Sequence, residues 1–330
     1  MIGAGRMGRL HAELLRWGMP RARLVGVADT VPERAAALAG RLEVEPLTPA
    51  WALASPEVDL VAICAPSDSH PDLVVAAAEA GKAIFCEKPL ALDLEELDRT
   101  LVAAESFGVD LTVGFNRRFD PAHRAARDAV RRGEVGEPHL VRLSSRDPAP
   151  PPPGYAASSG GMFLDMTIHD FDMARYLTGS EVVEVSALGA IRIDPDLEAL
   201  GDVDTAVVTL RHANGCLTVI DNSRRAVYGY DQRLEVFGSA GMAASENPPS
   251  VPSVLWTERG ARRPPLRASF LERYRPAYRE QWRWLLEDPS RREPVGAGAA
   301  DAREALVLGL AARRSLEEHR PVRIERPAGC

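Results

Sequence analysis

The sequence lacks a long apolar run and a surplus of basic residues, and each absence excludes a class of partner. No apolar run approaches the ~18 to 20 residues that a membrane-spanning helix needs, so we expect no membrane partner. The 40 Lys and Arg residues are outnumbered by 47 Asp and Glu residues, giving a net charge of −7. Because nucleic-acid binding usually requires a basic surplus, we also expect no nucleic-acid partner.

Cysteine is scarce, and its spacing excludes a redox motif or a zinc knuckle. The four cysteines, Cys64, Cys86, Cys216 and Cys330, lie far apart, with no C-x-x-C pair. The sequence also shows no secretory signal segment. We therefore interpret the cysteines as buried thiols of a cytoplasmic protein.

The 330 residues predict two domains, and the first shows strict alternation of strand and helix patterns. Short Val/Ile/Leu/Ala-rich runs at 23–29, 58–66, 83–89 and 109–115 fit strands that are buried on both faces. Amphipathic stretches at 11–17, 33–42, 73–80 and 94–107 fit the intervening helices. Residues 1–118 are therefore predicted to form an α/β Rossmann domain with a doubly wound parallel sheet.

Residues 119–330 have a different pattern, which predicts an α+β domain with an open, largely antiparallel sheet. Helices are expected at 123–132 and 162–177, and strands at 139–145, 182–193, 205–212, 216–224 and 233–237. Asn214-Gly215 signals a two-residue hairpin. The last helix, about 299–318, is expected to pack back on the first domain. The proline run at 148–153 is either a PxxP ligand or, as we favour, a stiff surface loop.

A glycine-rich turn opens the chain. Gly3, Gly5 and Gly8, with Arg6 and Met7 between the last two, form G-A-G-R-M-G, which allows a tight turn and close approach to a pyrophosphate. A helix and a strand follow, and the strand ends in Asp29, 21 residues beyond Gly8. A carboxylate at this point binds the ribose of NAD and repels the 2′-phosphate of NADP. The alternative is an ordinary glycine turn followed by a surface aspartate.

The strand before this turn is unusually short. Only Met1 and Ile2 precede Gly3, whereas a strand of roughly five residues is typical. Either the native protein has further residues before Met1, or the first strand is a stub. We expect the loss of that central strand to weaken the cofactor turn.

Two further motifs carry groups that are capable of chemistry. Glu87-Lys88-Pro89 ends the third strand run, at the sheet edge where ligands bind, so Lys88 could hold a substrate oxygen. The alternative is a solvated Lys-Glu pair.

The second motif is the predicted helix at 162–177. There Asp165, His169 and Asp172 are spaced i, i+4, i+7 and share a face, while Asp170 points elsewhere. A carboxylate beside an imidazole suits His169 as a proton acceptor. A solvated helix face and a metal site remain as alternatives. Because the cluster has no distant partner ligand, no metal is predicted.

These motifs together resemble the Gfo/Idh/MocA oxidoreductases, and within that family the inositol 2-dehydrogenases. The resemblance covers about residues 1–241 and rests on six segments: G-A-G-R-M-G, C-E-K-P-L, V-G-F-N-R-R-F-D-P, S-S-R-D-P-A-P-P-P, F-L-D-M-T-I-H-D-F-D-M-A-R and V-I-D-N-S-R-R-A-V-Y-G-Y-D-Q-R. It implies a catalytic group of Lys88, Asp165 and His169. It also implies that substrate hydroxyls are held by Arg118, Asp172 and Tyr228, and that the cofactor is flanked by Ala65, Pro66, His70 and Glu87.

The resemblance further implies a reaction and an assembly. The expected activity is oxidation of a cyclic polyol, specifically myo-inositol to 2-keto-myo-inositol (scyllo-inosose), with NAD as cofactor. Alternatives are another sugar or polyol dehydrogenase of the same family, acting on scyllo-inositol or glucose, or a non-catalytic NAD-binding regulator. Similar enzymes use the open sheet of the second domain for contacts between subunits, so a homotetramer is expected.

Overall fold

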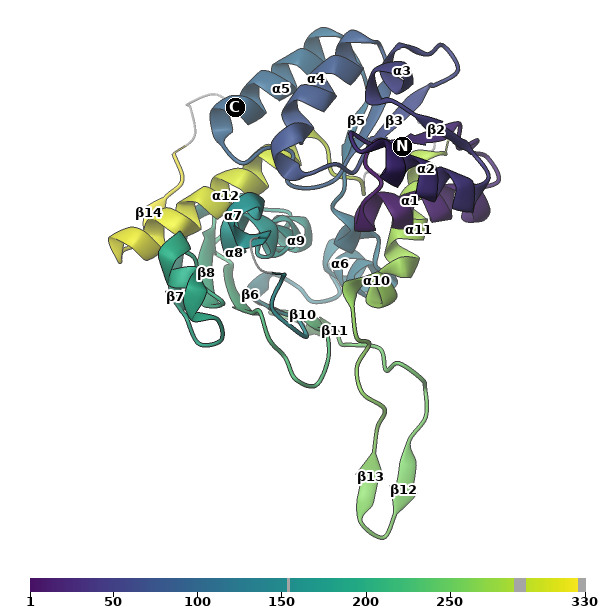
Figure 1. The fold of residues 1–330 in the computed structure, drawn as a ribbon. Coiled ribbons are helices and arrows are strands. Elements are labelled where there is room, and N and C mark those ends of the chain that lie inside the picture. Colours follow the sequence, from purple (N-terminus) through teal and green to yellow (C-terminus); the bar gives the residue numbers. More distant parts are fainter. Residues whose placement is uncertain (153–154, 288–294, 326–330) are drawn as a thin grey trace. The chain divides into compact units, whose positions relative to one another are not determined.

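The computed structural model describes residues 1–152, 155–287 and 295–325, and it divides into two compact units (Figure 1). The first unit comprises Met1–Asn116 and Ala277–Leu306, and the second comprises Arg117–Pro276 and Val307–Cys330. Two helices, α11 (Arg275–Leu285) and α12 (Ala299–Glu318), begin in one unit and end in the other. Each unit therefore contains a segment from late in the chain.

The first unit is built on a parallel sheet. Its strands are β1 (Gly26–Ala28), β2 (Glu45–Leu47), β3 (Leu60–Ile63), β4 (Ala83–Cys86) and β5 (Leu111–Val113). β1 pairs with β2, and β4 lies between β3 and β5, with every pairing parallel. Val113 adds an antiparallel bridge to Ala297. The predicted doubly wound parallel sheet is confirmed.

Met1 and Ile2 occupy the central position of this sheet. Ile2 bridges in parallel to Ala28 on one side and to Ile63 on the other, which joins β1 to β3. Its N–H donates to Ala62 O at 2.8 Å, and its carbonyl accepts from Cys64 N at 2.8 Å. Ile2 is only 2% exposed. Ile2 therefore connects the two parts of the sheet and leads directly into the glycine turn.

The helices of the first unit largely follow the predicted pattern: α1 (Arg6–Gly18), α2 (Pro32–Leu42), α4 (His70–Glu79) and α5 (Leu94–Ser106), with a 3-10 turn at Ser67–Ser69. A second 3-10 turn, Asn116–Phe119, begins at the last residue of the Met1–Asn116 segment and continues into the second unit. Sequence analysis missed β2 and the helix α3 (Pro49–Ala54). Both are short, three and six residues, and β2 has no buried residue, so neither leaves a clear apolar period.

The second unit is built on a seven-stranded sheet. Its order is β11-β10-β6-β9-β8-β7-β14, and only the pairing of β6 with β9 is parallel. The strands are β6 (Pro138–Arg146), β7 (Val182–Ala190), β8 (Thr205–His212), β9 (Leu217–Ser223), β10 (Asp231–Gly238), β11 (Met242–Ser245) and β14 (Val322–Arg323). The predicted largely antiparallel sheet is confirmed.

The helices of this unit are short apart from α6, α9 and α12. They are α6 (Pro121–Arg131), α7 (Tyr155–Ser159), α8 (Gly161–Asp165), α9 (Ile168–Thr178), α10 (Phe270–Arg273) and a 3-10 helix at Pro195–Leu200. The hairpin of β12 (Leu255–Thr257) and β13 (Gly260–Arg262) extends away from the sheet as a long arm (Figure 1). Of the predicted proline loop, Pro153 lies outside the described residues, as does Cys330.

The turn between β8 and β9 differs from its prediction. Asn214-Gly215 was expected to form a two-residue hairpin loop, but β8 ends at His212 and β9 begins at Leu217. Of the two residues, only Gly215 has a positive φ, +87°. A two-residue type I′ turn needs positive φ at both positions, so the chain uses a longer loop instead.

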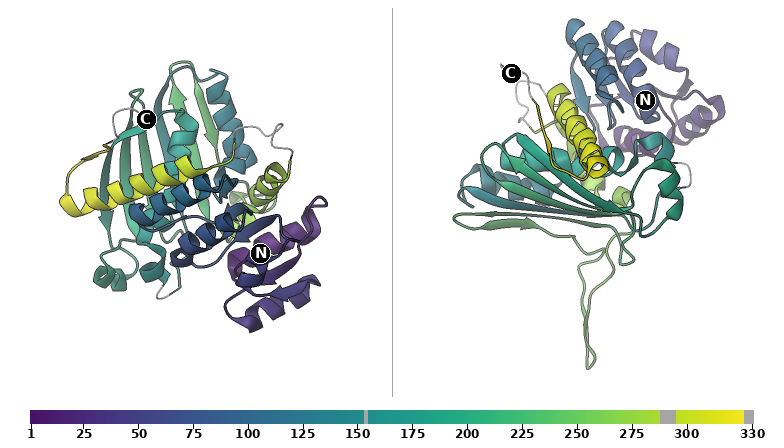
Figure 2. Two further views of the ribbon diagram at one scale, coloured as in Figure 1. Left: turned by 90° about the horizontal axis from the view of Figure 1, so that it is seen from above. Right: turned by 90° about the vertical axis from the view of Figure 1, so that its left-hand side faces the viewer.

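One face of the seven-stranded sheet is covered and the other is open (Figure 2). The covered face forms a core with α9 and the second half of α12, as in the cluster of Phe171, Val208, Ile220, Leu308 and Ala312. Along β8 burial alternates strictly, with Val207, Thr209 and Arg211 exposed. This alternation is the pattern of a sheet with one buried face.

Candidate active site

Two of the three glycines in the opening turn are required by backbone contacts. Gly3 has φ +99°, and a Cβ there would lie 2.5 Å from the carbonyl oxygen of Cys64. A Cβ on Gly8 would overlap the carbonyl oxygen of Gly3. These positions admit only glycine because α1 packs directly against the end of β3 and the turn.

Gly5 is different, because the space beside it is open. Among the described residues, a Cβ on Gly5 would meet no atom within 4 Å, so no steric contact there explains the glycine. Gly5 is the N-cap of α1, no side chain caps the helix, and its first turn, which begins with Arg6 and Met7, holds no acidic residue. Uncapped N–H groups at a helix N-terminus bind phosphate, so the turn fits the pyrophosphate of NAD.

Asp29 lies just after β1 and faces this turn. Its Oδ2 accepts from Ala4 N at 2.8 Å and its Oδ1 accepts from Val31 N at 2.9 Å. The two backbone bonds fix the half-buried carboxylate beside the glycine turn, and each oxygen keeps a further lone pair for a hydroxyl group. This geometry fits the predicted contact with the ribose of the cofactor.

His70 connects two loops at the carboxyl ends of strands β3 and β4. Its Nδ1 lies 2.7 Å from Pro89 O and its Nε2 lies 2.9 Å from Ala65 O. The imidazole is buried, and burial lowers the pKa of His70. His70 was predicted to flank the cofactor. In the structure its ring lies between the Ala65 carbonyl and the backbone beside Lys88, and the neutral imidazole donates to one of the two carbonyl oxygens.

Glu87 belongs to a buried chain of hydrogen bonds, called the relay below, that no sequence motif indicates. Trp282 Nε1 donates to His11 Nδ1 at 2.8 Å, which leaves His11 Nε2 to donate to Glu87 Oε1 at 2.7 Å. A Cβ on Gly114 would lie 2.9 Å from the carboxyl group of Glu87, so a glycine is needed there. The relay fixes Glu87 directly before Lys88, which is half-buried.

The segment that carries Asp165 and His169 is not the single helix predicted for 162–177. α8 ends at Asp165 and α9 begins at Ile168, and the N–H of Thr167 bonds to Met162 O, five residues earlier. Such a wide turn changes the helical phase between Asp165 and His169, and wide turns of this kind are frequent at functional sites. The prediction of one continuous helical face is therefore wrong for Asp165.

Asp165 is held by two side chains of the same unit. Its Oδ1 accepts from Tyr155 OH at 3.1 Å, and its Oδ2 accepts from Arg224 Nη1 at 3.1 Å. His169 lies in the first turn of α9 and is half-buried.

The residue after His169 anchors α9 to the sheet. Asp170 Oδ1 accepts from Arg117 Nη1 and from Ser145 Oγ, both at 2.6 Å, and its Oδ2 accepts from Asn222 Nδ2 at 2.9 Å. All four residues are at most 5% exposed. Sequence analysis placed Asp170 away from the reactive face but gave no sign of this network, because its members are up to 105 positions apart (222 − 117).

Arg118 and Asp172 were both predicted to bind substrate, and the structure pairs them with each other. Asp172 Oδ1 lies 2.5 Å from Arg118 Nη2, and Asp172 Oδ2 accepts from Arg118 Nε at 2.9 Å. Both side chains are buried, and this two-point contact orients the guanidinium against α9.

Tyr228, the third predicted substrate residue, belongs to another network. Its OH donates to Asp231 Oδ2 at 2.7 Å and accepts from Arg146 Nη1 at 3.0 Å. Burial and the bond to Asp231 raise the pKa of Tyr228. Tyr228 is 48% exposed, so its hydroxyl group is fixed while the residue remains open to solvent.

The predicted residues thus divide between the units. The first unit contains the glycine turn, Asp29, His70, Glu87 and Lys88, and the second contains Arg118, Asp165, His169, Asp172 and Tyr228. Among the described residues, no group of three or more His, Cys, Asp or Glu could hold a metal ion. No helix in those same ranges is both long and apolar enough to cross a membrane.

Two family profiles cover most of the chain. Residues 1–115 match an oxidoreductase family with an NAD-binding Rossmann fold, and residues 123–244 match the GFO/IDH/MocA C-terminal domain. The chain belongs to the Gfo/Idh/MocA oxidoreductase family. As a member of this family it binds NAD, which confirms the predicted cofactor.

Within the Gfo/Idh/MocA family, the chain is similar over its full length to inositol dehydrogenases. It is 46% identical to the myo-inositol 2-dehydrogenase of Thermotoga maritima, over 100% of this chain and 99% of that one. The crystal structure of a putative myo-inositol dehydrogenase from Sinorhizobium meliloti superposes with a TM-score of 0.94 at 45% identity, covering 98% of both chains. The scyllo-inositol dehydrogenase of Lactobacillus casei, solved with NAD(H) and scyllo-inositol, gives 0.89 at 29% identity, covering 98% and 97%.

Proposed function

We propose that this protein oxidises one secondary hydroxyl group of a cyclic polyol, specifically myo-inositol to 2-keto-myo-inositol (scyllo-inosose). The observation that carries the proposal is an imidazole, His169, four residues beyond a carboxylate that two side chains fix, in a chain 46% identical over its whole length to a myo-inositol 2-dehydrogenase. Bound NAD supplies the hydride acceptor, and Gly3, Gly5, Arg6, Met7, Gly8 and Asp29 would hold it, flanked by Ala65, Pro66, His70 and Glu87.

The proposed proton chemistry uses three residues. His169 accepts the hydroxyl proton, and the fixed carboxylate of Asp165 orients the imidazole and stabilises its charged form. Lys88 binds the reacting oxygen, where its positive charge favours the developing alkoxide. The relay from Trp282 through His11 to Glu87 keeps the backbone of Lys88 in place, so we propose that it preserves the orientation of Lys88.

Substrate hydroxyls are proposed to bind to Arg118, Asp172 and Tyr228. These residues mix donors with acceptors, which suits several neutral hydroxyl groups better than one phosphate or carboxylate. In the structure each has a partner that fixes its orientation: Arg118 and Asp172 hold each other, and Asp231 and Arg146 hold the phenol. Preorganised groups of this kind discriminate between epimers, since a misdirected hydroxyl leaves one of them unpaired.

The test is NADH formation with a panel of polyols. Purified protein is incubated with NAD⁺ and myo-inositol, scyllo-inositol, glucose or another polyol, and absorbance of NADH is followed. We expect the highest kcat/KM with myo-inositol. A higher value with scyllo-inositol would favour the second candidate, which the similarity to the Lactobacillus casei enzyme supports. NAD binding without NADH formation on any polyol would favour a non-catalytic regulator.

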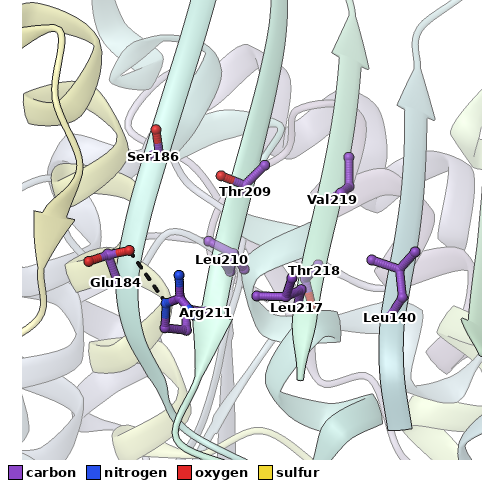
Figure 3. A pocket seen from close by; sticks show the side chains of 9 residues that line it. All are labelled: Leu140, Glu184, Ser186, Thr209, Leu210, Arg211, Leu217, Thr218 and Val219. Carbon is purple, nitrogen blue, oxygen red and sulfur yellow. Dashed lines mark ion pairs between the residues drawn. The ribbon is translucent and has the colours of Figure 1, made fainter. Parts of the chain in front are cut away.

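We also propose a homotetramer, assembled through the open face of the seven-stranded sheet. That face exposes apolar side chains, including Leu188 at 71%, Leu217 at 43% and Met242 at 57%. Figure 3 shows Thr209, Val219 and Leu140 along neighbouring strands of this face, beside the ion pair of Glu184 with Arg211. An apolar sheet face of this kind is typical of an interaction surface. Sedimentation equilibrium checks the assembly, and we expect Leu217→Glu to lower the oligomeric state.

We further propose that the protein acts in the cytoplasm. The supporting observation is that Cys64, Cys86 and Cys216 are buried free thiols. Burial raises the pKa of each thiol, which keeps the cysteines protonated and unreactive.

A further inference from the structure

The side chain of Arg224 lies directly against Asp165, the carboxylate that is proposed to orient His169. It follows the end of β9 and is 3% exposed. Its Nη1 donates to Asp165 Oδ2 at 3.1 Å. The Nη2 atom has no hydrogen-bond partner among the described residues, so this contact with Asp165 is the main one that the structure records for the guanidinium.

Acidic groups face Arg224 from several elements. Asp165 belongs to α8, Asp147 follows β6 with its Oδ2 3.9 Å from Arg224 Nη1, and Asp202 follows the 3-10 helix at Pro195–Leu200. Tyr155 of α7 donates its hydroxyl proton to Asp165. Burial alone would lower the pKa of Arg224, but Asp165 and Asp147 raise it above the usual value, so the guanidinium stays charged.

The backbone around Arg224 is fixed on both sides. Its own N–H donates to Asp204 O at 2.8 Å. The N–H of Asp147 donates to Ser223 O at 2.9 Å, and the N–H of Ala226 donates to Asp147 O at 2.6 Å. These two backbone hydrogen bonds to Asp147 fix the turn after β9, so the backbone that carries the Arg224 guanidinium is held in place.

We propose that Arg224 is a positioning residue for proton transfer. It fixes the carboxylate of Asp165 in one orientation, and it places a buried positive charge beside the Asp165–His169 segment. The proposal rests on the function proposed above, because it assigns Arg224 to the same acid and base. Arg224 forms and breaks no bond in the reaction; the hydroxyl proton still passes to His169.

The charge has a consequence of definite sign. A buried cation makes proton binding less favourable at every neighbouring group, so its removal raises the proton affinity of both Asp165 and His169. Since His169 must be unprotonated to accept a proton, the acidic limb of the kcat/KM profile moves to higher pH when the cation is removed. A purely structural role would lower activity equally at all pH values.

The experiment compares Arg224→Gln, which removes the charge, with Arg224→Lys, which retains it. NADH formation from myo-inositol is measured from well below to well above the ordinary histidine pKa of about 6.5. For Arg224→Gln we expect the midpoint of the acidic limb of the kcat/KM profile to move up by roughly 0.5 to 1 pH unit. The cause is the loss of the electrostatic effect of the Arg224 charge, which is weakly screened in the protein interior. We also expect kcat to fall about tenfold with the KM for NAD⁺ unchanged. In Arg224→Lys the acidic limb should have the same midpoint pH as in the wild type, because the positive charge is retained.

The matched control is Arg175→Gln, which removes another arginine–carboxylate pair of the same unit. Arg175 pairs with Glu181 at 2.7 Å and belongs to no proposed site. Its profile should coincide with that of the wild type. A limb that is unmoved in Arg224→Gln, or moved equally in Arg224→Lys, would overturn the proposal.

A second readout requires no substrate. The His169 ring is titrated by NMR in the full-length protein, where it is one of seven histidines and is assigned with His169→Gln. We expect its midpoint to rise in Arg224→Gln. If the wild type forms no NADH with any polyol, the proposed function fails, and the NMR midpoint still decides whether Arg224 acts on His169. An unmoved midpoint would refute that action.

Discussion

The glycine turn of the first unit and the α8–α9 segment of the second are built by different means. In the turn, backbone atoms define the geometry: Gly3 and Gly8 are required by carbonyl oxygens a few ångströms away, and Gly5 leaves open space. Around α9, buried side-chain pairs define it, as with Arg117 and Asp170 or Arg118 and Asp172. The turn therefore depends on the absence of side chains, whereas α9 depends on the presence of matched charges.

The largest expected effect tests whether His169 of α9 is the base that accepts the hydroxyl proton. His169→Ala should lower the kcat of myo-inositol oxidation by roughly 10² to 10⁴, because general-base assistance is lost. NAD binding, followed by calorimetry, should persist because the glycine turn is untouched. His139→Ala, in the exposed part of β6, is the control. Full activity of His169→Ala would exclude His169 as the base.

The second effect concerns the stability of the same segment. Asp170→Asn should lower the free energy of unfolding by about 3 to 5 kcal/mol, because Arg117 stays buried without its counter-charge. Replacing both residues, Arg117→Met with Asp170→Leu, should recover part of this loss, because the unpaired charge is removed while Ser145 and Asn222 still lose their acceptor. Denaturant unfolding measures both. If the double variant is no more stable than Asp170→Asn, the cost does not come from an unpaired charge.

A third prediction concerns the pH dependence of stability that a buried histidine gives to the second unit. His123, in the second unit, has its pKa lowered to about 4, chiefly by burial, from 6.5. The unfolded chain therefore binds this proton more readily, and stability falls as pH drops through about 6.5 towards 4. The loss approaches about 3 kcal/mol at the lower end. In His123→Gln the unfolding free energy should depend less steeply on pH in this range than in the wild type. An equal slope in both proteins would show that His123 does not cause the pH dependence.

The smallest effect tests the turn itself. Gly5→Ala should fold as the wild type does, since its Cβ meets nothing, yet bind NAD about tenfold more weakly because the methyl group occupies the approach of the pyrophosphate. Gly40→Ala, within α2 and equally unobstructed, is the control and should bind NAD normally. Equal NAD affinity in both variants would remove Gly5 from the cofactor site.

Prediction from the sequence worked where a feature depends on neighbouring residues. The family membership and the NAD cofactor that the local motifs predict are confirmed, whereas the roles of the glycine turn, Asp29 and Glu87-Lys88-Pro89 stay predictions. It failed where a contact joins distant segments. Trp282, which sets the tautomer of His11, lies 271 positions from it, and no local pattern marks such a pair.

The sequence by itself determined the alternation of elements, the glycine positions and the identities of the acid, base and lysine candidates, because these follow from local periodicity and motif spacing. Only the tertiary structure decided how Ile2 joins β1 to β3, that a wide turn separates Asp165 from His169, and which arginine pairs with which aspartate. The physical reason is that a buried charge must find its partner in space, and the fold brings that partner from far along the chain.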